Sequence, residues 1–160
     1  MNEANRVSVQ ITTPTSREVV VSRVFHAPRD KVFDALTKPE LLRRWYGPPG
    51  WTLVVCEVDL RVDGMWRFVL HKPNGMVVGQ RGVYREIVPA EKLVNTETWE
   101  DWDAGETVVT TRLVENAGRT TFTSTILFPS EEVRDTVVKS GLESGVSELY
   151  DKLDGLLAAI

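Results

Sequence analysis

Hydrophobic residues recur with two different periods along this chain. Between residues 51 and 128 they alternate with polar residues, and a period of two is typical of β-strands with one buried face. Beyond Pro129 the spacing becomes three or four residues, which is the period of an α-helix. Upstream, the β-branched run at residues 17–26 predicts one more strand. The pattern therefore predicts an α+β chain whose strands precede a long C-terminal helix.

Six strands are predicted in the alternating region. They cover residues 51–60, 65–71, 76–88, 92–100, 106–115 and 119–128. Turn sequences such as Asp63-Gly64 and Asn116-Ala117-Gly118 separate them and contain residues that tolerate a positive φ. Consecutive strands with short turns favour an antiparallel meander.

Two short helices are predicted between the first strand and the meander. Pro28 opens the first helix, and Pro39 ends it and starts the second, because proline suits a first helical position. The Gly-Pro-Pro-Gly sequence at residues 47–50 cannot continue a helix and predicts a turn.

The C-terminal helix is predicted to start near Glu131, after Pro129-Ser130. Its apolar stripe consists of Leu142, Val146, Leu149, Leu153, Leu156 and Ile160. We expect this stripe to pack on the sheet; a coiled-coil contact is the alternative, and a homodimer stays open. Residues 1–16 are a tail or an edge strand, with the tail preferred, and residues 17–160 form a single domain.

Composition narrows the range of functions. The 160 residues carry a formal net charge of -4, so the basic surface that nucleic acids require is not expected. The single cysteine, Cys56, fits a reducing compartment, and neither a membrane-spanning stretch nor a signal-peptide core is evident. A cytoplasmic protein that binds neither nucleic acid nor a membrane is expected.

A set of spaced motifs resembles a known superfamily. The motifs are Ala27-Pro28, Val32-Phe33, Ala35-Leu36-Thr37, Pro39-Glu40-Leu41-Leu42, Trp45, Gly47-Pro48, Asp59-x-Arg61, Gly64-x-Trp66-Arg67, Gly82-x-Tyr84, Ile87-x-Pro89-x-x-x-Leu93 and Trp99. They resemble the START-like (SRPBCC, Bet v 1-like) helix-grip superfamily over residues 17–158. Within it, the chain is similar to the branch named after the C-terminal domain of the activator of heat-shock protein ninety ATPase.

The resemblance implies a fold more than a function. It implies a curved antiparallel sheet of about six to seven strands, wrapped around the C-terminal helix with a cavity between them. Members of the superfamily include lipid carriers, hormone receptors, polyketide cyclases, antibiotic self-resistance proteins and co-chaperone domains. The branch often has Gly-Trp where this chain has Gly145-Val146, and this departure implies a larger or differently shaped cavity.

Candidate ligand-binding residues follow from aromatic content and strand alternation. If Trp66 points inward, so does Phe68; the same parity applies to the two other strands that carry Tyr84 and Trp99. The full set is Trp45, Trp66, Phe68, Gln80, Gly82, Tyr84, Asn95, Glu97, Trp99, Gly141, Leu142 and Gly145. Aromatic walls with a few polar groups are typical of a small-molecule site.

Cofactor and metal chemistry is not indicated by the sequence. His26, His71 and Cys56 lack metal-ligand spacing, and no glycine-rich nucleotide-binding motif or serine nucleophile motif is present. We therefore expect no metal and no cofactor.

Three functional hypotheses remain. The first is a non-catalytic module that binds an apolar or aromatic small molecule. The second is a cyclase, aromatase or hydrolase acting on a polyketide-like substrate, with Glu97 or Tyr84 as its acid–base residue. This enzyme hypothesis requires the Glu97 carboxyl to be buried and to face a cavity that contains water. If Glu97 were exposed and ion-paired, the hypothesis would lose its acid–base residue. The third is a co-chaperone-like or regulatory domain that binds a protein partner.

Overall fold

A single antiparallel sheet and four helices make up the computed structural model, which describes residues 9–160. The strands are β1 (Gln10–Thr12), β2 (Glu18–Phe25), β3 (Thr52–Val58), β4 (Met65–His71), β5 (Val77–Val88), β6 (Lys92–Trp99), β7 (Thr107–Asn116) and β8 (Arg119–Leu127). The helices are α1 (Arg29–Thr37), α2 (Pro39–Trp45), α3 (Glu131–Lys139) and α4 (Leu142–Ala159). The predicted α+β class is confirmed.

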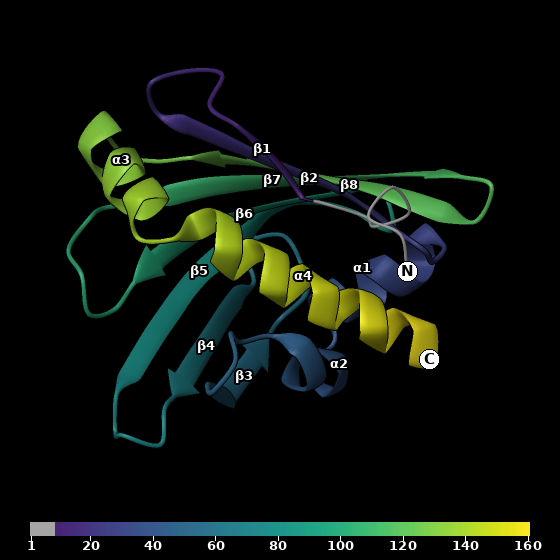
Figure 1. Cartoon of the computed structure of the whole chain (residues 1–160), viewed down its shortest axis with the longest axis horizontal. Coiled ribbons are helices and arrows are strands. Elements are labelled where there is room, and N and C mark those ends of the chain that lie inside the picture. Colours follow the sequence, from purple (N-terminus) through teal and green to yellow (C-terminus); the bar gives the residue numbers. More distant parts are fainter. Residues whose placement is uncertain (1–8) are drawn as a thin grey trace.

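The sheet has eight strands in the order β1-β2-β8-β7-β6-β5-β4-β3. Each strand from β3 to β8 pairs with the next along the chain, as the predicted meander requires, and β2 pairs with β8. The sheet curves around α4, and α1 and α2 lie near the C-terminal half of that helix (Figure 1). This is the helix-grip arrangement.

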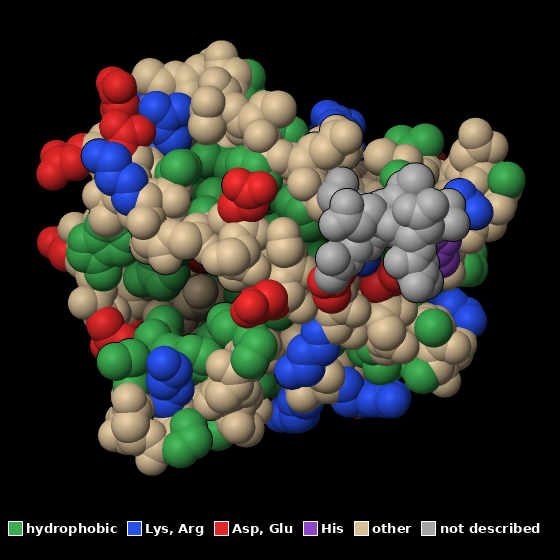
Figure 2. All heavy atoms as spheres, viewed as in Figure 1, with side chains coloured by type: hydrophobic (Ala, Val, Ile, Leu, Met, Phe, Trp, Pro, Cys, Tyr) green, Lys and Arg blue, Asp and Glu red, His purple; other side chains and the backbone are tan. Residues whose placement is uncertain are grey.

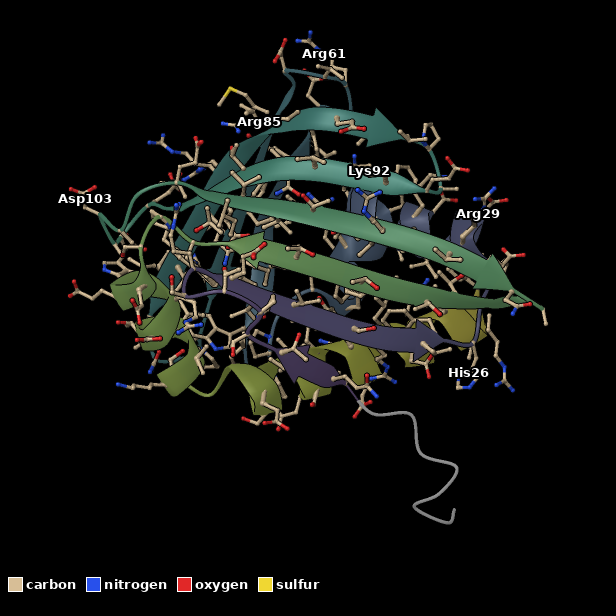
Figure 3. All side chains as sticks on the ribbon, turned by 90° about the horizontal axis from the view of Figure 1, so that it is seen from above. His26, Arg29, Arg61, Arg85, Lys92 and Asp103 are labelled. Carbon is tan, nitrogen blue, oxygen red and sulfur yellow. The ribbon has the colours of Figure 1, made fainter. Side chains whose placement is uncertain are left out.

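Alternation of side chains assigns the two faces of the sheet. In β2, Val19, Val21, Arg23 and Phe25 are buried, whereas the alternate residues Val20, Ser22 and Val24 are partly exposed. The opposite face carries charged side chains, among them Arg85 and Lys92 in ion pairs with Glu106 and Glu86 (Figure 3). The inner face is therefore the one that can form a core and a cavity.

The predicted strand ends differ from the observed ones by only one or two residues, but the N-terminal segment differs more. Gln10–Thr12 forms the edge strand β1, which pairs with β2, so the edge-strand alternative holds for these residues. Ile11 packs beside Val19 and Val21, which gives this short strand an apolar contact. The rest of the segment, residues 1–8, lies outside the described residues.

The C-terminal helix is not continuous, in contrast to the expectation of one helix from Glu131. Gly141 has φ +94°, a left-handed conformation that no residue inside an α-helix adopts, and it separates α3 from α4. Ser130 caps α3 as predicted, and its hydroxyl accepts a hydrogen bond from the Val133 amide at 3.2 Å. Because of the break, α3 points away from the axis of α4 (Figure 1).

The C-terminal half of α4 is anchored to the sheet. Leu153 and Leu156 of the predicted stripe are buried in the main core together with Leu157, whereas Ile160, the predicted last member of the stripe, is 37% exposed. Arg23 of β2, only 5% exposed, bonds to Asp151 at 2.6 Å. The N-terminal half of α4 lacks comparable burial, and the space beneath it forms a cavity. Among the described residues, no helix is long and apolar enough to cross a membrane.

Candidate functional site

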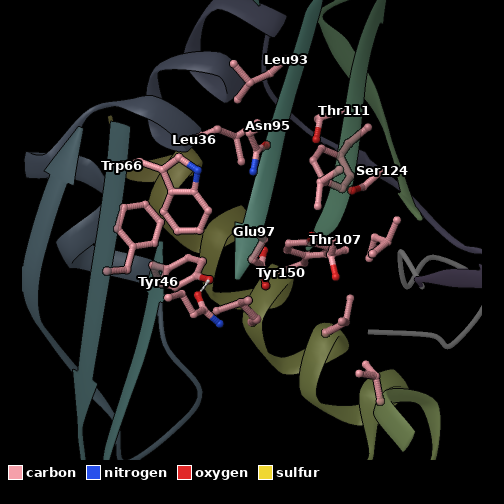
Figure 4. A pocket seen from close by; sticks show the side chains of 18 of the residues that line it. Leu36, Tyr46, Trp66, Leu93, Asn95, Glu97, Thr107, Thr111, Ser124 and Tyr150 are labelled. Carbon is pink, nitrogen blue, oxygen red and sulfur yellow. Dashed lines mark hydrogen bonds between the residues drawn. The ribbon is translucent and has the colours of Figure 1, made fainter. Parts of the chain in front are cut away.

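An inner cavity of about 360 Å³ lies between the concave face of the sheet and α4 (Figure 4). Its lining is contributed by α1, α2, α3, α4 and strands β4 to β8. The lining residues are Leu36, Trp45, Tyr46, Trp66, Phe68, Gln80, Tyr84, Leu93, Asn95, Glu97, Trp99, Thr107, Val109, Thr111, Phe122, Ser124, Ile126, Phe128, Val137, Leu142, Val146, Leu149 and Tyr150.

Aromatic rings form one side of the inner cavity. The Phe68 ring lies 4.9 Å from the Tyr46 ring and 4.9 Å from the Trp66 ring, measured between centroids. The Trp66 indole donates to the Thr96 carbonyl at 3.1 Å, and the Trp45 indole donates to the Ala35 carbonyl at 2.8 Å. Both indole N–H groups are thus occupied by the protein, and the two rings present apolar surface to the cavity.

Polar side chains form a stripe on the sheet floor. Glu97 of β6 is paired in register with Thr107 of β7, and Thr111 of β7 with Ser124 of β8. All four line the inner cavity, as Figure 4 shows. Thr107 is only 1% exposed, and its hydroxyl oxygen has no hydrogen-bond partner among the described residues. Buried hydroxyls are normally paired, so this unpaired and almost inaccessible oxygen is an exception.

Glu97 is the acidic residue of this stripe. Its side chain is partly buried by the cavity walls, and this desolvation raises the pKa of its carboxyl from 4.5 to about 7. Desolvation is the sole cause of the shift, because the uncharged acid is favoured away from water. The carboxyl is therefore close to half-protonated at neutral pH.

Three tyrosine hydroxyls also line the inner cavity. Burial raises the pKa values of Tyr46, Tyr84 and Tyr150, and the charge of Glu97 adds to the effect on Tyr46 and Tyr150. These phenols therefore stay protonated at neutral pH and can donate hydrogen bonds. Tyr46 donates one to the Gln80 side-chain oxygen at 2.7 Å.

An outer pocket of about 380 Å³ adjoins the inner cavity. Both are lined by Tyr46, Gln80, Leu142, Val146 and Leu149, so the Tyr46–Gln80 hydrogen bond lies where they meet. The outer pocket also includes Gly47, Pro48, Trp51, Leu70, Val78, Ser140, Gly141 and Gly145. Figure 2 shows a hollow edged by hydrophobic side chains on the face that carries the start of α4. Together the two pockets offer room for an elongated ligand.

Most of the predicted site residues fall into these two pockets. The inner cavity contains Trp45, Trp66, Phe68, Gln80, Tyr84, Asn95, Glu97, Trp99 and Leu142. Gly141 and Gly145 line the outer pocket only. The parity argument along β4, β5 and β6 therefore selected side chains that share one face.

Gly82 lines neither pocket, in contrast to the expectation from the sequence. A Cβ at this position would overlap the carbonyl oxygen of Thr96 and lie 2.8 Å from the Trp66 indole nitrogen. The lack of a side chain at Gly82 thus allows β5 and β6 to approach and lets Trp66 reach its hydrogen-bond acceptor. Its role is in packing.

Sequence reasoning missed five polar lining residues: Tyr46, Thr107, Thr111, Ser124 and Tyr150. The same period-two parity, extended along β7 and β8 from Leu113 and Phe122, would have identified the three hydroxyls on these strands. Tyr46 follows the end of α2, and Tyr150 lies beside the apolar stripe of α4, so neither fits a simple periodic pattern.

The two histidines and the cysteine do not assemble into a site. His26 is half-exposed and lies 3.6 Å from Asp154, whereas Cys56 is buried in the core. Within residues 9–160, no three His, Cys, Asp or Glu side chains are grouped so that they could hold a metal ion.

The cavity and the fold match a family model and several solved structures. The model described as "Activator of Hsp90 ATPase homolog 1-like protein" matches residues 26–158. This chain belongs to that family. The match covers α1 to α4 and every strand from β3 to β8, and therefore the elements that line both pockets.

Solved structures of relatives share the fold. A protein of Rhodobacter sphaeroides is 30% identical, with a TM-score of 0.91 over 96% of this chain and 99% of that chain. A protein of Nitrosomonas europaea shares the architecture at 22% identity, with a TM-score of 0.82 over 92% of this chain and 97% of that chain. A protein of Mycobacterium smegmatis shares it at 20% identity, with a TM-score of 0.84 over 97% of this chain and 99% of that chain. No curated protein sequence matches the chain.

Val146 of α4 lines both the inner cavity and the outer pocket, and it is the position at which the sequence resemblance implies a tryptophan in many members. A valine there leaves space that an indole ring would fill. The cavity of this family member is thus shaped in part by a single residue of α4.

Proposed function

We propose that this protein is a small-molecule binding module that holds an apolar or aromatic ligand between the sheet and α4. The observation that carries the proposal is the inner cavity of about 360 Å³ in the core of the domain. This volume falls in the range of roughly 300–1,000 Å³ that is usual for ligand sites. The aromatic side supplies apolar contact, and the polar stripe supplies orientation.

The cavity is more than imperfect packing. A cavity left by poor packing would be apolar, because burial of unpaired polar groups is costly. This one is lined by the ionisable Glu97, and the unpaired Thr107 hydroxyl is buried in the wall beside it. The chain retains an ionisable group where a ligand would contact it, which supports selection for binding.

Filling the cavity tests the proposal. Val146→Trp should occupy the space between α4 and the sheet and weaken binding of the neutral aromatic probe 2-naphthylmethanol by at least tenfold. Val114→Trp is the matched control, because Val114 is 64% exposed on β7 and should not affect binding. Titration calorimetry measures both affinities, and circular dichroism checks folding. Equal affinities in the two folded variants, or failure of the wild type to bind both this alcohol and its amine analogue 2-naphthylmethylamine, would refute the proposal.

The proposal also includes a cytoplasmic setting. The cysteine at position 56 is a buried free thiol, and burial raises its pKa, so it is a poor nucleophile. A free thiol suits a reducing compartment. Fractionation of cells that express the protein would test this assignment.

A second candidate function is acid–base catalysis, and Glu97 is the observation that favours it. A carboxyl with a pKa of about 7 can both accept and donate a proton near neutral pH. In a cyclisation of a polyketide-like chain, Glu97 would remove a proton from a carbon between two carbonyl groups. The resulting enolate would attack a third carbonyl, and the new alkoxide would receive the proton.

Loss of turnover with retained binding would identify catalysis. A poly-β-ketone thioester incubated with the wild type should give a cyclised product that mass spectrometry and absorbance can detect. Glu97→Gln should bind the substrate and form no product above the uncatalysed rate. Equal rates for the wild type, Glu97→Gln and buffer alone would leave binding as the only activity.

A further inference from the structure

The charge pattern of the inner cavity is one-sided. Glu97 is an ionisable acid, whereas no lysine, arginine or histidine occurs among the residues that line the space. The remaining polar lining consists of amides, hydroxyls and phenols. In the described part of the chain, the cavity thus contains one source of negative charge and no internal cation to neutralise it.

No element packed around Glu97 supplies a partner for its carboxyl. β5 presents Tyr84 and Gln80, and β7 presents Thr107. The end of α2 presents Tyr46, and α4 presents Tyr150; both phenols experience the charge of Glu97. Within residues 9–160, the carboxyl has neither an ion pair nor a hydrogen bond, and burial alone accounts for its shifted pKa.

A buried carboxyl of this kind is either protonated or ionised beside a compensating positive charge. A cation in contact recovers much of the cost of desolvating the ionised form, so a cationic ligand favours that form. The aromatic rings on the other side of the cavity favour the ring system of the same occupant, because aromatic rings attract one another in stacked and edge-to-face arrangements. Tyr46, Phe68 and Trp66 provide such rings within the cavity.

We propose that the ligand is an aromatic or alicyclic amine, bound as its ammonium ion with an N–H donated to the Glu97 carboxylate. Its ring system lies against the aromatic side of the cavity formed by Tyr46, Trp66 and Phe68. This inference rests on the proposed binding function and assigns the chemical class of the ligand.

Amine binding makes a specific prediction for pH. The ammonium ion requires the ionised form of Glu97, whose free pKa is about 7. The affinity should therefore increase by up to tenfold per pH unit from pH 5 to about 7, and then stay level until the amine loses its own proton. A ligand that accepts a hydrogen bond from protonated Glu97 would show the opposite trend.

Two probes of the same shape test the assignment. 2-Naphthylmethylamine carries an ammonium group at neutral pH, and 2-naphthylmethanol has a hydroxyl in its place. At pH 8 the wild type should bind the amine at least tenfold more tightly than the alcohol, as measured by titration calorimetry. Glu97→Gln should abolish this difference, because the amide keeps the shape of the side chain and removes its charge.

The control and the outcomes separate this inference from the proposed function. Glu106→Gln removes the same charge from an exposed residue paired with Arg85 outside the cavity, and it should leave the preference for the amine intact. Equal binding of both probes, or preference for the alcohol with affinity falling as pH rises, would overturn the amine assignment and leave the binding function standing. Failure of both probes to bind would overturn both.

Discussion

Glu97 shows how a single residue connects the stability of this domain to its function. Its carboxyl is desolvated by the same walls that form the inner cavity, and the folded protein therefore binds its proton more tightly than the unfolded chain does. Because the folded state binds this proton more tightly, the free energy of unfolding decreases as pH rises and the proton is lost. The cost is retained at a position where a ligand would contact the side chain.

Replacing Glu97 should reveal this cost directly. Because the pKa rises from 4.5 to about 7, the stability that its proton contributes is complete below pH 4.5 and is lost as pH increases through 7. Glu97→Gln should thus match the wild type near pH 4.5 and exceed it by up to roughly 3 kcal/mol at pH 8. Urea unfolding at both pH values measures the difference.

Glu106→Gln serves as the control for this comparison. This exposed carboxylate pairs with Arg85 on the outer surface, and its replacement should change stability by less than about 1 kcal/mol at either pH. If Glu97→Gln were equally stable or less stable than the wild type at pH 8, burial of an uncompensated charge would be the wrong description of this site.

Individual site residues differed in how well the sequence revealed them. Trp66, Tyr84, Glu97 and Trp99 lie on strands with clear alternation, so parity predicted which residues share a face, such as Glu97 with Trp99, once the direction of one residue was assumed. Tyr46 was missed because it follows α2 at the start of an irregular turn, where no period applies. Its position depends on contact with the Phe68 ring, which is a tertiary contact between distant segments.

At the scale of elements, Gly82 governs the contact between two strands. The side chain of Thr96 accepts a hydrogen bond from the Val83 amide at 3.0 Å, and a Cβ at position 82 would collide with the Thr96 carbonyl. Gly82→Ala should destabilise the protein by about 1–3 kcal/mol, because β5 must move away from β6. Thermal or urea unfolding measures this change.

Gly155→Ala provides the matched control for that substitution. Gly155 lies within α4, and a Cβ there would meet no atom within 4 Å. The higher helix propensity of alanine should stabilise the protein by up to about 1 kcal/mol. Destabilisation of similar size in both variants would show that the close contact at Gly82 is not the cause.

The order of elements was predictable from sequence, whereas two of their boundaries were not. Period-two alternation and the turn sequences located every strand from β2 to β8. One continuous helix from Glu131 was expected instead of a break at Gly141. A glycine in the sequence does not reveal whether its φ is left-handed. Strand β1 was unclear because three residues are too few to show a period.

At the scale of the whole molecule, the two ends of α4 have different tasks. Its C-terminal half is fixed by buried leucines and by the contact of Arg23 with Asp151 and Asp154, 2.6 Å and 3.5 Å away. Its N-terminal half covers the inner cavity and edges the outer pocket. This division keeps the domain folded while leaving space within it.

Removal of Arg23 should loosen the grip of the sheet on the helix. The guanidinium is almost fully buried, and Asp154 is largely so, whereas Asp151 is more exposed. We expect Arg23→Ala to cost about 2–3 kcal/mol, a value reduced from that of a fully buried pair because water screens Asp151. Arg61→Ala, which breaks an exposed pair with Asp59, should cost less than about 1 kcal/mol. Equal effects in urea unfolding would contradict the anchoring role.

The central claim is that the domain encloses a small molecule, and native mass spectrometry of the freshly purified protein tests it most directly. Compared with the denatured protein, the native wild type should carry a reproducible extra mass that is lost on unfolding, and Val146→Trp should lack it. Identical native and denatured masses for the wild type, with no adduct after addition of either naphthyl probe, would contradict the account.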